Sequence, residues 1–354
     1  MLTTAWNEVD FGQFATLQRG YDLPSRARRR GTVPVVTSTG VTDTHAEAKE
    51  RAPGVVTGRY GTIGEVFFIE EDYWPHNTTL FVKDFHSNDP LFVSYLLRTI
   101  DFKSHSGKSG VPGVNRNDLH ALRISIPPTV AEQRAIAVAL SDVDTLLGAL
   151  NQLIAKKRDL KQAAMQQLLT RQTRLPGFDG EWEVKRLATV CSMKSGEGIT
   201  SADIDEFSQY PCYGGNGLRG FTSHFTHTGG YSLIGRQGAL CGNVLGVDGT
   251  FFASEHAIVA TAFPQTDIRW LTYVLGELRL NQYSESSAQP GLSVAKLLNL
   301  DLVVPSTKAE QTAIAEALSD MDAELAALEQ RREKTRAIKQ GMMQELLTGR
   351  TRLV

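Results

Sequence analysis

The chain has 354 residues, of which 41% are hydrophobic and 21% charged, and its formal net charge is −2. This composition is typical of a globular protein with two or three domains, and no global charge demands a nucleic-acid or membrane partner. Three cysteines exclude a disulfide framework, and the absence of a signal-peptide pattern or a membrane-length apolar run predicts a cytoplasmic protein.

Residues 1–130 form a first globular block that mixes short β-like runs with one helical run. The runs at 33–37, 66–69 and 80–82 predict strands, and residues 90–99 predict a helix. The mixture indicates an α/β domain.

A long amphipathic helix of about 40 residues, followed by a linker, is predicted within residues 131–175. Thr129 and Glu132 have the spacing of a capping box that would begin it. Apolar residues then recur in alternating steps of four and three, as in a helix that keeps one stripe against a partner helix. This stripe consists of Ile136, Leu140, Val143, Leu147, Leu150 and Ile154, and after a polar stretch it resumes at Leu160, Ala164 and Leu168. The shift across the polar stretch indicates a stutter in the heptad pattern.

Residues 176–308 form a second block of similar length. The runs at 231–234 and 257–260 predict strands, and residues 267–280 predict a helix. The two blocks resemble one another weakly, at a few landmarks only. Gly58-Arg59-Tyr60-Gly61 matches Gly235-Arg236-Gln237-Gly238, and Pro112-Gly113 matches Pro290-Gly291. Matched landmarks within otherwise different sequences indicate that the two blocks share a fold but differ in surface residues. This pattern favours two recognition modules that bind different targets.

Residues 309–354 repeat the long helix. Residues 127–175 align with residues 305–353 without a gap, and 29 of these 49 positions are identical, so the chain contains a true internal repeat. Thr307 and Glu310 repeat the capping-box spacing. The second stripe consists of Ile314, Leu318, Met321, Leu325 and Leu328, and it resumes at Ile338, Met342 and Leu346.

The charges of the two helices predict how they pair. Each helix is acidic in its first half and mostly basic in its second half. The acidic residues are Asp142 and Asp144, then Glu316, Asp320, Asp322 and Glu324; the basic ones are Lys156, Lys157, Arg158 and Lys161, then Arg331, Arg332, Lys334, Arg336 and Lys339. Antiparallel packing sets opposite charges side by side and also complements each helix dipole.

The order of block, long helix, linker, block and repeated helix closely resembles the specificity subunit of type I restriction–modification systems. The resemblance covers the whole chain. Its most specific motifs are Pro127 with Ala131-Glu132-Gln133, residues 173–178 with Trp182, and Pro305 with Ala309-Glu310-Gln311. The resemblance implies an α+β fold in which two α/β target-recognition domains are separated by two long helices. These helices would form an antiparallel coiled coil, and the repeat looks circularly permuted, with pseudo-two-fold symmetry. The expected domains are residues 1–130, 131–175, 176–308 and 309–354.

The resemblance also implies a function and a set of partners. Each recognition domain would read one half of a bipartite site in double-stranded DNA. The helix pair would set the spacing and dock modification (methyltransferase) subunits in two copies, and restriction/translocase subunits would complete the complex. S-adenosylmethionine, ATP and Mg are expected in those partner subunits, with no cofactor or metal in this chain and no membrane partner.

Candidate DNA contacts follow from the chemistry of recognition, in which cations contact phosphates and forked donors contact base edges. Arg59 and Arg236 lie in Gly-Arg-x-Gly turns, where glycine permits close approach. The arginine run at 26–30 and the loops before each long helix fit either DNA contacts or solvated loops. The full set is Arg26, Arg28, Arg29, Arg30, Arg59, Tyr60, Lys103, Lys108, Arg116, Arg219, Arg236, Gln237, Gln282 and Gln289.

We expect no catalytic residue in this chain. Gly107-Lys108-Ser109 lacks the first glycine of a phosphate-binding loop, because Phe102 stands in its place. No glycine-rich cofactor loop follows a strand. The chain is therefore expected to be a non-catalytic subunit of an enzyme complex, an adenine-specific DNA methyltransferase and type I site-specific endonuclease. The alternative is a coiled-coil assembly scaffold that binds no DNA and whose blocks bind protein partners.

Overall fold

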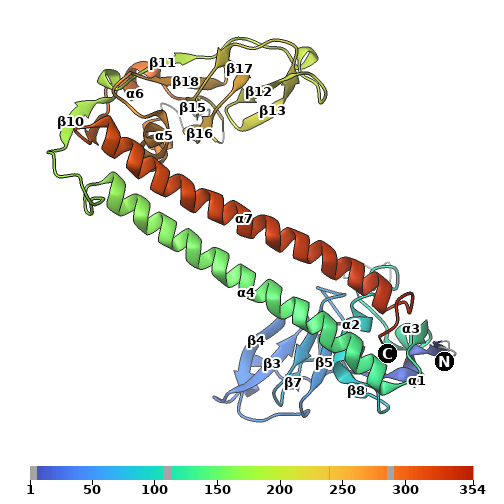
Figure 1. The fold of residues 1–354 in the computed structure, drawn as a ribbon. Helices are drawn as coiled ribbons and strands as arrows, with labels where there is room; N and C mark the ends of the chain where they lie inside the picture. The colour runs from blue at the N-terminus through green and yellow to red at the C-terminus, as the bar shows by residue number, and fades with distance from the viewer. Residues whose placement is uncertain (1–5, 107–112, 239, 285–290, 354) are drawn as a thin grey trace. The chain divides into compact units, whose positions relative to one another are not determined.

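The computed structural model describes residues 6–106, 113–238, 240–284 and 291–353 (Figure 1). The chain divides into two compact units, Met1–Asn151 with Gln330–Val354, and Gln152–Glu329. Each unit therefore combines one of the predicted blocks with one half of each long helix.

The first module (residues 6–126) contains three small sheets. Strand β1 (Asn7–Asp10) pairs antiparallel with β9 (Arg123–Ile126), so the two ends of the module meet. A four-stranded sheet has the order β2-β8-β5-β6, and a three-stranded sheet has the order β4-β3-β7. Their strands are β2 (Thr16–Arg19), β3 (Val33–Thr37), β4 (Gly40–His45), β5 (Gly54–Gly58), β6 (Val66–Ile69), β7 (Trp74–Pro75) and β8 (Thr79–Asp84). The three strands predicted in this block are confirmed.

Three short helices complete the first module: α1 (Phe11–Phe14), α2 (Pro90–Leu97) and α3 (Arg116–His120). Helix α2 begins at Asp89, whose Oδ1 accepts a hydrogen bond from the backbone N–H of Phe92 at 3.0 Å. Such a cap satisfies an amide that has no partner within the helix. Six of the eight residues of α2 are buried, which explains why its sequence is apolar on all sides.

The second module (residues 182–304) repeats this topology. Strand β10 (Glu183–Arg186) pairs with β19 (Asp301–Val304), and the two further sheets have the orders β11-β18-β15-β16 and β13-β12-β17-β14. Their strands are β11 (Cys191–Ser195), β12 (Tyr210–Gly214), β13 (Gly217–Thr222), β14 (His227–Thr228), β15 (Tyr231–Gly235), β16 (Val244–Val247), β17 (Thr250–Ala253) and β18 (Ala257–Ala262). Its helices are α5 (Ile268–Glu277) and α6 (Val294–Leu298).

The correspondence between the modules extends to strand direction. In each module one sheet holds a single parallel pair, β3 with β7 or β12 with β17, among antiparallel neighbours, and the sheet of the second module has one further strand, β14. The repeat predicted from the helices therefore includes the modules, although their sequences have diverged. The predicted α+β class, with two modules and two long helices, is confirmed.

Helices α4 (Val130–Leu169) and α7 (Lys308–Leu346) carry the predicted stripe. Ile136, Leu140, Leu150, Ile154, Ile314, Leu318 and Leu325 are buried, and Val143, Leu147, Met321 and Leu328 are half-buried. Within each unit the stripe joins the helices to the module. Leu140 belongs to a core cluster with Phe92 and Leu346, and Leu318 to one with Trp270 and Leu168.

The predicted stripe is wrong at Leu160 and Ile338, which are 47% and 51% exposed. No stutter is present, because the steps of four and three continue through polar residues. The continuation positions are Lys157, Lys161, Arg332, Thr335 and Lys339, of which Thr335 is buried and the others are half-buried. Long basic side chains can lay their methylene groups along a helix interface while the charged end reaches water.

The two helices run in opposite directions within each unit (Figure 1). In the first unit, Lys339 Nζ on α7 lies 2.6 Å from Asp144 Oδ1 on α4. In the second unit, Lys157 Nζ lies 2.7 Å from Glu324 Oε1, and Lys161 pairs with Asp322. The antiparallel pairing of acidic and basic halves is thus confirmed. Ion pairs at the surface contribute about 0.2–1 kcal/mol each, and these pairs remain partly exposed, so they select the direction while the apolar stripe supplies most of the stability.

Only half of each predicted capping box forms. Thr129 Oγ1 accepts from the backbone N–H of Glu132, and Thr307 Oγ1 from that of Glu310, both at 3.3 Å. The reciprocal bonds from the glutamates are replaced, because both carboxylates bind arginine and tryptophan side chains instead.

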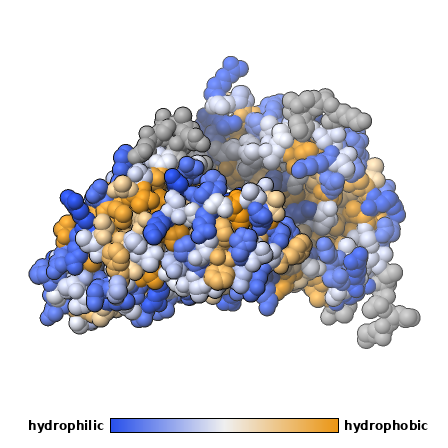
Figure 2. All heavy atoms as spheres, turned by 90° about the horizontal axis from the view of Figure 1, so that it is seen from above, coloured by the Kyte–Doolittle hydropathy of each residue, from blue (hydrophilic) through white to orange (hydrophobic). Residues whose placement is uncertain are grey.

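None of the described helices combines the length and apolar content needed to cross a membrane. The face of the molecule in Figure 2 intersperses hydrophilic residues with smaller hydrophobic patches. Apolar atoms contribute much of any folded surface, so this face alone indicates no binding site.

Candidate nucleic-acid interface

The two Gly-Arg-x-Gly turns occupy equivalent places in the two modules. Arg59 follows β5, and Arg236 follows β15. A Cβ on Gly58 would lie 1.8 Å from the carbonyl oxygen of Thr62, and Gly61 has a positive φ of 78°. Both glycines are thus required by close approach or by a left-handed backbone.

Each turn meets the loop that precedes the last short helix of its module. In the first module Tyr60 pairs with Gly113, and the backbone N–H of Val114 donates to the carbonyl of Arg59 at 3.0 Å. In the second, Gln237 pairs with Gly291, and Leu292 N–H donates to the carbonyl of Arg236 at 2.9 Å. Landmarks more than fifty residues apart in sequence are therefore neighbours in space. Pro112 and Pro290, the other halves of the Pro-Gly landmarks, lie outside the described residues.

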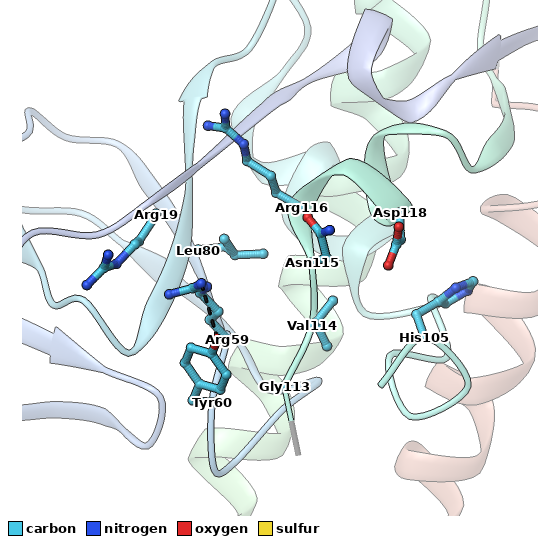
Figure 3. Close-up of a pocket in the computed structure, with 10 residues that line it drawn as sticks. All are labelled: Arg19, Arg59, Tyr60, Leu80, His105, Gly113, Val114, Asn115, Arg116 and Asp118. Atoms are coloured by element: carbon cyan, nitrogen blue, oxygen red, sulfur yellow. Dashed lines mark hydrogen bonds between the residues drawn. The ribbon is translucent and has the colours of Figure 1, made fainter. Parts of the chain in front are cut away.

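A cavity of about 470 Å³ opens beside the first turn (Figure 3). Its lining residues are Arg19, Arg59, Tyr60, Leu80, His105, Gly113, Val114, Asn115, Arg116 and Asp118. Three arginines and one aspartate make this lining cationic overall, which suits a phosphate or an electronegative base edge.

Arg59 and Tyr60 form a stacked pair at this cavity. The guanidinium carbon of Arg59 lies 4.4 Å from the centroid of the Tyr60 ring, and Arg59 Nη2 donates to the Tyr60 hydroxyl at 3.3 Å. The ring also lies close to Gly113, where an added Cβ would be 2.5 Å from Tyr60 Cε1. The ring is thus held against backbone while 44% of the residue stays exposed.

The second module has a smaller cavity, of about 240 Å³, lined by Gly215, Asn216, Arg219, Gln237 and His256. Arg219 lies on β13, and its Cδ would be 2.6 Å from a Cβ on Gly214, so the arginine stem covers that glycine. The lining offers one arginine with amide and imidazole groups. The two cavities therefore present different hydrogen-bonding chemistry on matched scaffolds.

The structure brings together Arg59, Tyr60 and Arg116 in one cavity and Arg219 with Gln237 in the other. The arginine run lies elsewhere in the first module. Arg28 pairs with Asp43 at 2.6 Å and Arg29 with Glu47 at 2.5 Å, while Arg26 and Arg30 are exposed. As DNA contacts these four residues stay a prediction.

The remaining predicted contacts are spread over the loops before the long helices. Lys103 is exposed near His105, and Gln282 donates its side-chain amide to the carbonyl of Leu278 at 2.9 Å. Arg236 is half-buried in its turn. Lys108 and Gln289 lie outside the described residues.

Sequence reasoning missed Arg19, Asn115, Asn216 and His256 as cavity residues. Arg19 ends strand β2, and Asn115 caps helix α3 by accepting from Asn117 N–H at 3.0 Å. No local motif marks these residues, because tertiary folding alone brings them beside the arginine turns.

At the start of each long helix, the glutamate of the repeated Ala-Glu-Gln segment binds an arginine that follows the end of the other long helix. We name this contact the glutamate clamp, formed by Glu132, Arg352 and Trp6 in the first unit and by Glu310, Arg174 and Trp182 in the second. Glu310 accepts from Arg174 Nε at 2.9 Å, Arg174 Nη2 at 2.7 Å and Trp182 Nε1 at 3.1 Å. In the first unit, the Trp6 bond is 3.4 Å long.

Arginine and tryptophan satisfy a carboxylate that is almost fully buried in each clamp. Glu132 is 5% exposed and Glu310 is 1% exposed. Charge-assisted, forked bonds of this kind raise the pKa of Arg174 and Arg352. The glutamines next to these glutamates connect each long helix to its module through a hydrogen bond. Gln133 Oε1 accepts from the backbone N–H of Asp89 at 3.0 Å, and Gln311 Oε1 accepts from that of Asp267 at 2.9 Å.

The second aspartate of each Leu-Ser-Asp-x-Asp segment joins three elements. We name this the tyrosine–aspartate–lysine contact. Tyr95 of α2 donates to Asp144 Oδ2 at 2.8 Å, and Lys339 of α7 pairs with the same carboxylate. Tyr273 of α5 likewise donates to Asp322 Oδ2 at 2.7 Å, with Lys161 as the cation. Burial raises the pKa of Tyr95, and that of Tyr273 to about 12, so both phenols keep the proton that they donate.

A double-mutant cycle tests this contact in the second unit. We expect Tyr273→Phe to lower the free energy of unfolding by about 1 kcal/mol, the usual net value of a hydrogen bond. Combined with Asp322→Ala, the effects should be non-additive by about 0.5 kcal/mol or more, because the two groups share one interaction. Denaturant titrations of the four proteins measure this, and strictly additive losses would show that the bond is absent in solution.

Residues 4–157 and 179–337 both match the family described as type I restriction modification DNA specificity domain. An Escherichia coli protein, type I restriction enzyme EcoprrI specificity subunit, is 44% identical over 146 residues, covering 40% of this chain and 36% of that protein. The alignment thus spans about a third of that relative's length. A Methanocaldococcus jannaschii protein, type I restriction enzyme MjaVIII specificity subunit, is 24% identical over 308 residues, covering 74% of this chain and 70% of the relative.

Solved structures resemble the chain along its whole length. The crystal structure of a type I restriction–modification S subunit from M. genitalium aligns with a TM-score of 0.76 and 17% identity, covering 98% of this chain and 97% of that one. A second structure, described as the basis of complex assembly and conformational transition of the type I system, aligns with a TM-score of 0.55 and 17% identity over 99% of both chains. At this identity the likeness concerns the fold alone.

Proposed function

The chain belongs to the type I restriction–modification DNA specificity family, and from that membership we propose that it is the non-catalytic, DNA-reading subunit of such a complex. Each module would read one half of a bipartite site in double-stranded DNA. The observation that carries this proposal is the pair of matched arginine turns, each beside a cavity whose lining differs between the modules.

Local positive charge would have to supply the attraction for DNA. A net charge of −2 gives the whole chain no attraction for DNA, so binding must come from clustered cations. Arg19, Arg59 and Arg116 form one such cluster. Cations supply affinity through phosphates, and different side chains beside them supply sequence selectivity through base edges.

In the complex, the long helices would separate the two readers and dock modification subunits, in two copies, with restriction/translocase subunits added in a complete system. S-adenosylmethionine, ATP and Mg would be bound by those partners, and the assembly would act in the cytoplasm. The tyrosine–aspartate–lysine contacts join each module to both long helices within its unit. They support a spacing role, because a helix pair that sets a distance must hold each module firmly.

Exchange of a module tests the proposal. We expect that replacing residues 1–130 with the matching block of another family member changes one half of the methylated bipartite sequence and leaves the other half intact. Mapping of methylated adenines in cells that express the chain with its modification subunits measures this. A change in both halves would contradict independent modules.

Salt dependence separates DNA reading from the scaffold alternative. A complex that neutralises 6–10 phosphates should lose roughly 10³–10⁵ in affinity between 50 and 200 mM salt, through counterion release. A scaffold whose modules bind only protein would show no site-specific DNA affinity at either salt concentration.

A further inference from the structure

The two arginine turns differ in how their arginines are supported. Arg59 stacks on Tyr60, whose ring rests against Gly113. In the second module the equivalent of Tyr60 is Gln237, and a Cβ on Gly291 would meet nothing nearer than the carbonyl oxygen of Arg236, at 3.9 Å. Among the residues that the structure describes, the second turn therefore lacks the aromatic support that Arg59 has.

We propose that Arg59 reads a guanine in the major groove of the half-site bound by the first module. This inference rests on the proposed function, and it names the base that the first cavity recognises. Tyr60 and Gly113 are positioning residues in this scheme, because they act through the arginine.

The aromatic support limits the rotation of the guanidinium. The guanidinium carbon lies 4.4 Å from the centroid of the Tyr60 ring, and Nη2 donates to the Tyr60 hydroxyl at 3.3 Å, so two contacts to one side chain restrict the group. Arginine carries five N–H donors in a planar fork, so one bond to Tyr60 leaves the others for a ligand. A fork that is oriented before binding loses less entropy when it pairs with two acceptors.

The geometry of a fork selects guanine among the four bases. Guanine presents two adjacent acceptors, O6 and N7, on its major-groove edge, whereas adenine presents a donor beside its N7 acceptor. A phosphate also accepts an arginine fork through two of its oxygens, but it carries no sequence information. Tyr60 beside Arg59 is replaced by Gln237 at the equivalent position of the second module, as expected of a base contact that differs between half-sites.

The other arginines of the cavity suit the flanking phosphates. Arg19 and Arg116 are both exposed, and in Figure 3 the guanidinium of Arg116 extends away from the Tyr60 ring. Their role would be to add affinity without sequence preference.

The first experiment compares Arg59→Lys with wild type in the assembled complex of this chain and its modification subunits. The probe is a set of duplexes in which each base pair of the methylated half-site is changed in turn. We expect Arg59→Lys to lose discrimination at one G·C pair by about 10-fold or more, the scale of a bidentate pair. The matched control, Arg236→Lys, should leave this half-site profile unchanged.

Modified bases identify the atoms. In wild type, 7-deazaguanine at that position removes the N7 acceptor and should weaken binding about 5-fold or more, while inosine keeps O6 and N7 and should bind normally. Tyr60→Leu, which removes the stacking ring but keeps the arginine, should reproduce part of the Arg59→Lys loss. Partial loss is expected because the charge and the fork remain while their orientation is released.

Several outcomes would overturn the inference. Arg59→Lys with an unaltered base profile would make Arg59 a phosphate contact, and insensitivity to 7-deazaguanine at every guanine of the half-site would exclude a base contact. Variants that bind DNA as wild type but fail to assemble with modification subunits would place Arg59 at a protein interface. If the wild-type complex shows no site-specific binding at all, the proposed function itself fails, and that result is distinct from the others.

Discussion

Replacing Leu318 with alanine is expected to lower the free energy of unfolding by about 2–5 kcal/mol, the range for a large apolar side chain removed from a packed core. Leu318 is fully buried and belongs to the cluster that includes Trp270 of the second module and Leu168 of α4. The substitution leaves a cavity in a core that the second module shares with both long helices. Denaturant unfolding followed by circular dichroism measures the loss.

Leu160→Ala is the matched control, because it makes the same chemical change on a long helix at a residue that is 47% exposed. We expect a change within about 0.5 kcal/mol, as for ordinary surface substitutions. Comparable losses at Leu318 and Leu160 would contradict the arrangement described here and would favour the apolar stripe with a stutter.

Glu310→Ala is expected to destabilise the protein by about 3 kcal/mol. The substitution removes the carboxylate that accepts hydrogen bonds from both Arg174 and the indole N–H of Trp182. These two donors would then be buried without an acceptor, and the lost hydration of such groups lowers stability. Glu132→Ala should cost less, because Glu132 is slightly more exposed and its Trp6 bond is longer, at 3.4 Å.

The control for the clamp is Glu316→Ala on the same helix, whose side chain is 61% exposed and pairs with Arg269 at 3.5 Å. Exposed pairs contribute little, so we expect a change of about 0.5 kcal/mol or less. Thermal and denaturant unfolding of the three variants ranks them. Equal effects at Glu310 and Glu316 would mean that the clamp is open in solution.

Periodicity and charge made the long helices predictable. The steps of four and three, the helix starts and the antiparallel direction follow from spacing and charge order alone, since these patterns act between neighbours along one helix or between two aligned ones. The helices end earlier than the predicted segments, at Leu169 and Leu346. The sequence did not predict that the stripe continues through Lys157, Lys161 and Thr335. A search for apolar periodicity omits polar residues, although their side chains can pack in the same helix interface.

The repeated motif itself was visible, but its purpose was not. The spacing of Glu132 and Glu310 predicts a capping box, whereas in the structure both carboxylates bind the arginines of the clamp. These arginines, Arg352 and Arg174, follow the opposite helix, 220 and 136 residues away in sequence. A local sequence pattern gives no information on a partner that is so far away along the chain.

The duplicated architecture, the class of the modules and the arginine turns can be read from the amino-acid order, because each depends on repetition, on spacing or on glycines with a local conformational role. The side chains that line each cavity are known only from the folded chain. Arg19 and His256 join the turns from other strands and loops, and Tyr60 gains its support from Gly113, far along the chain. The physical reason is that a recognition surface is assembled from loops whose mutual placement is set by sheet topology, and topology depends on long-range pairing that no short stretch encodes.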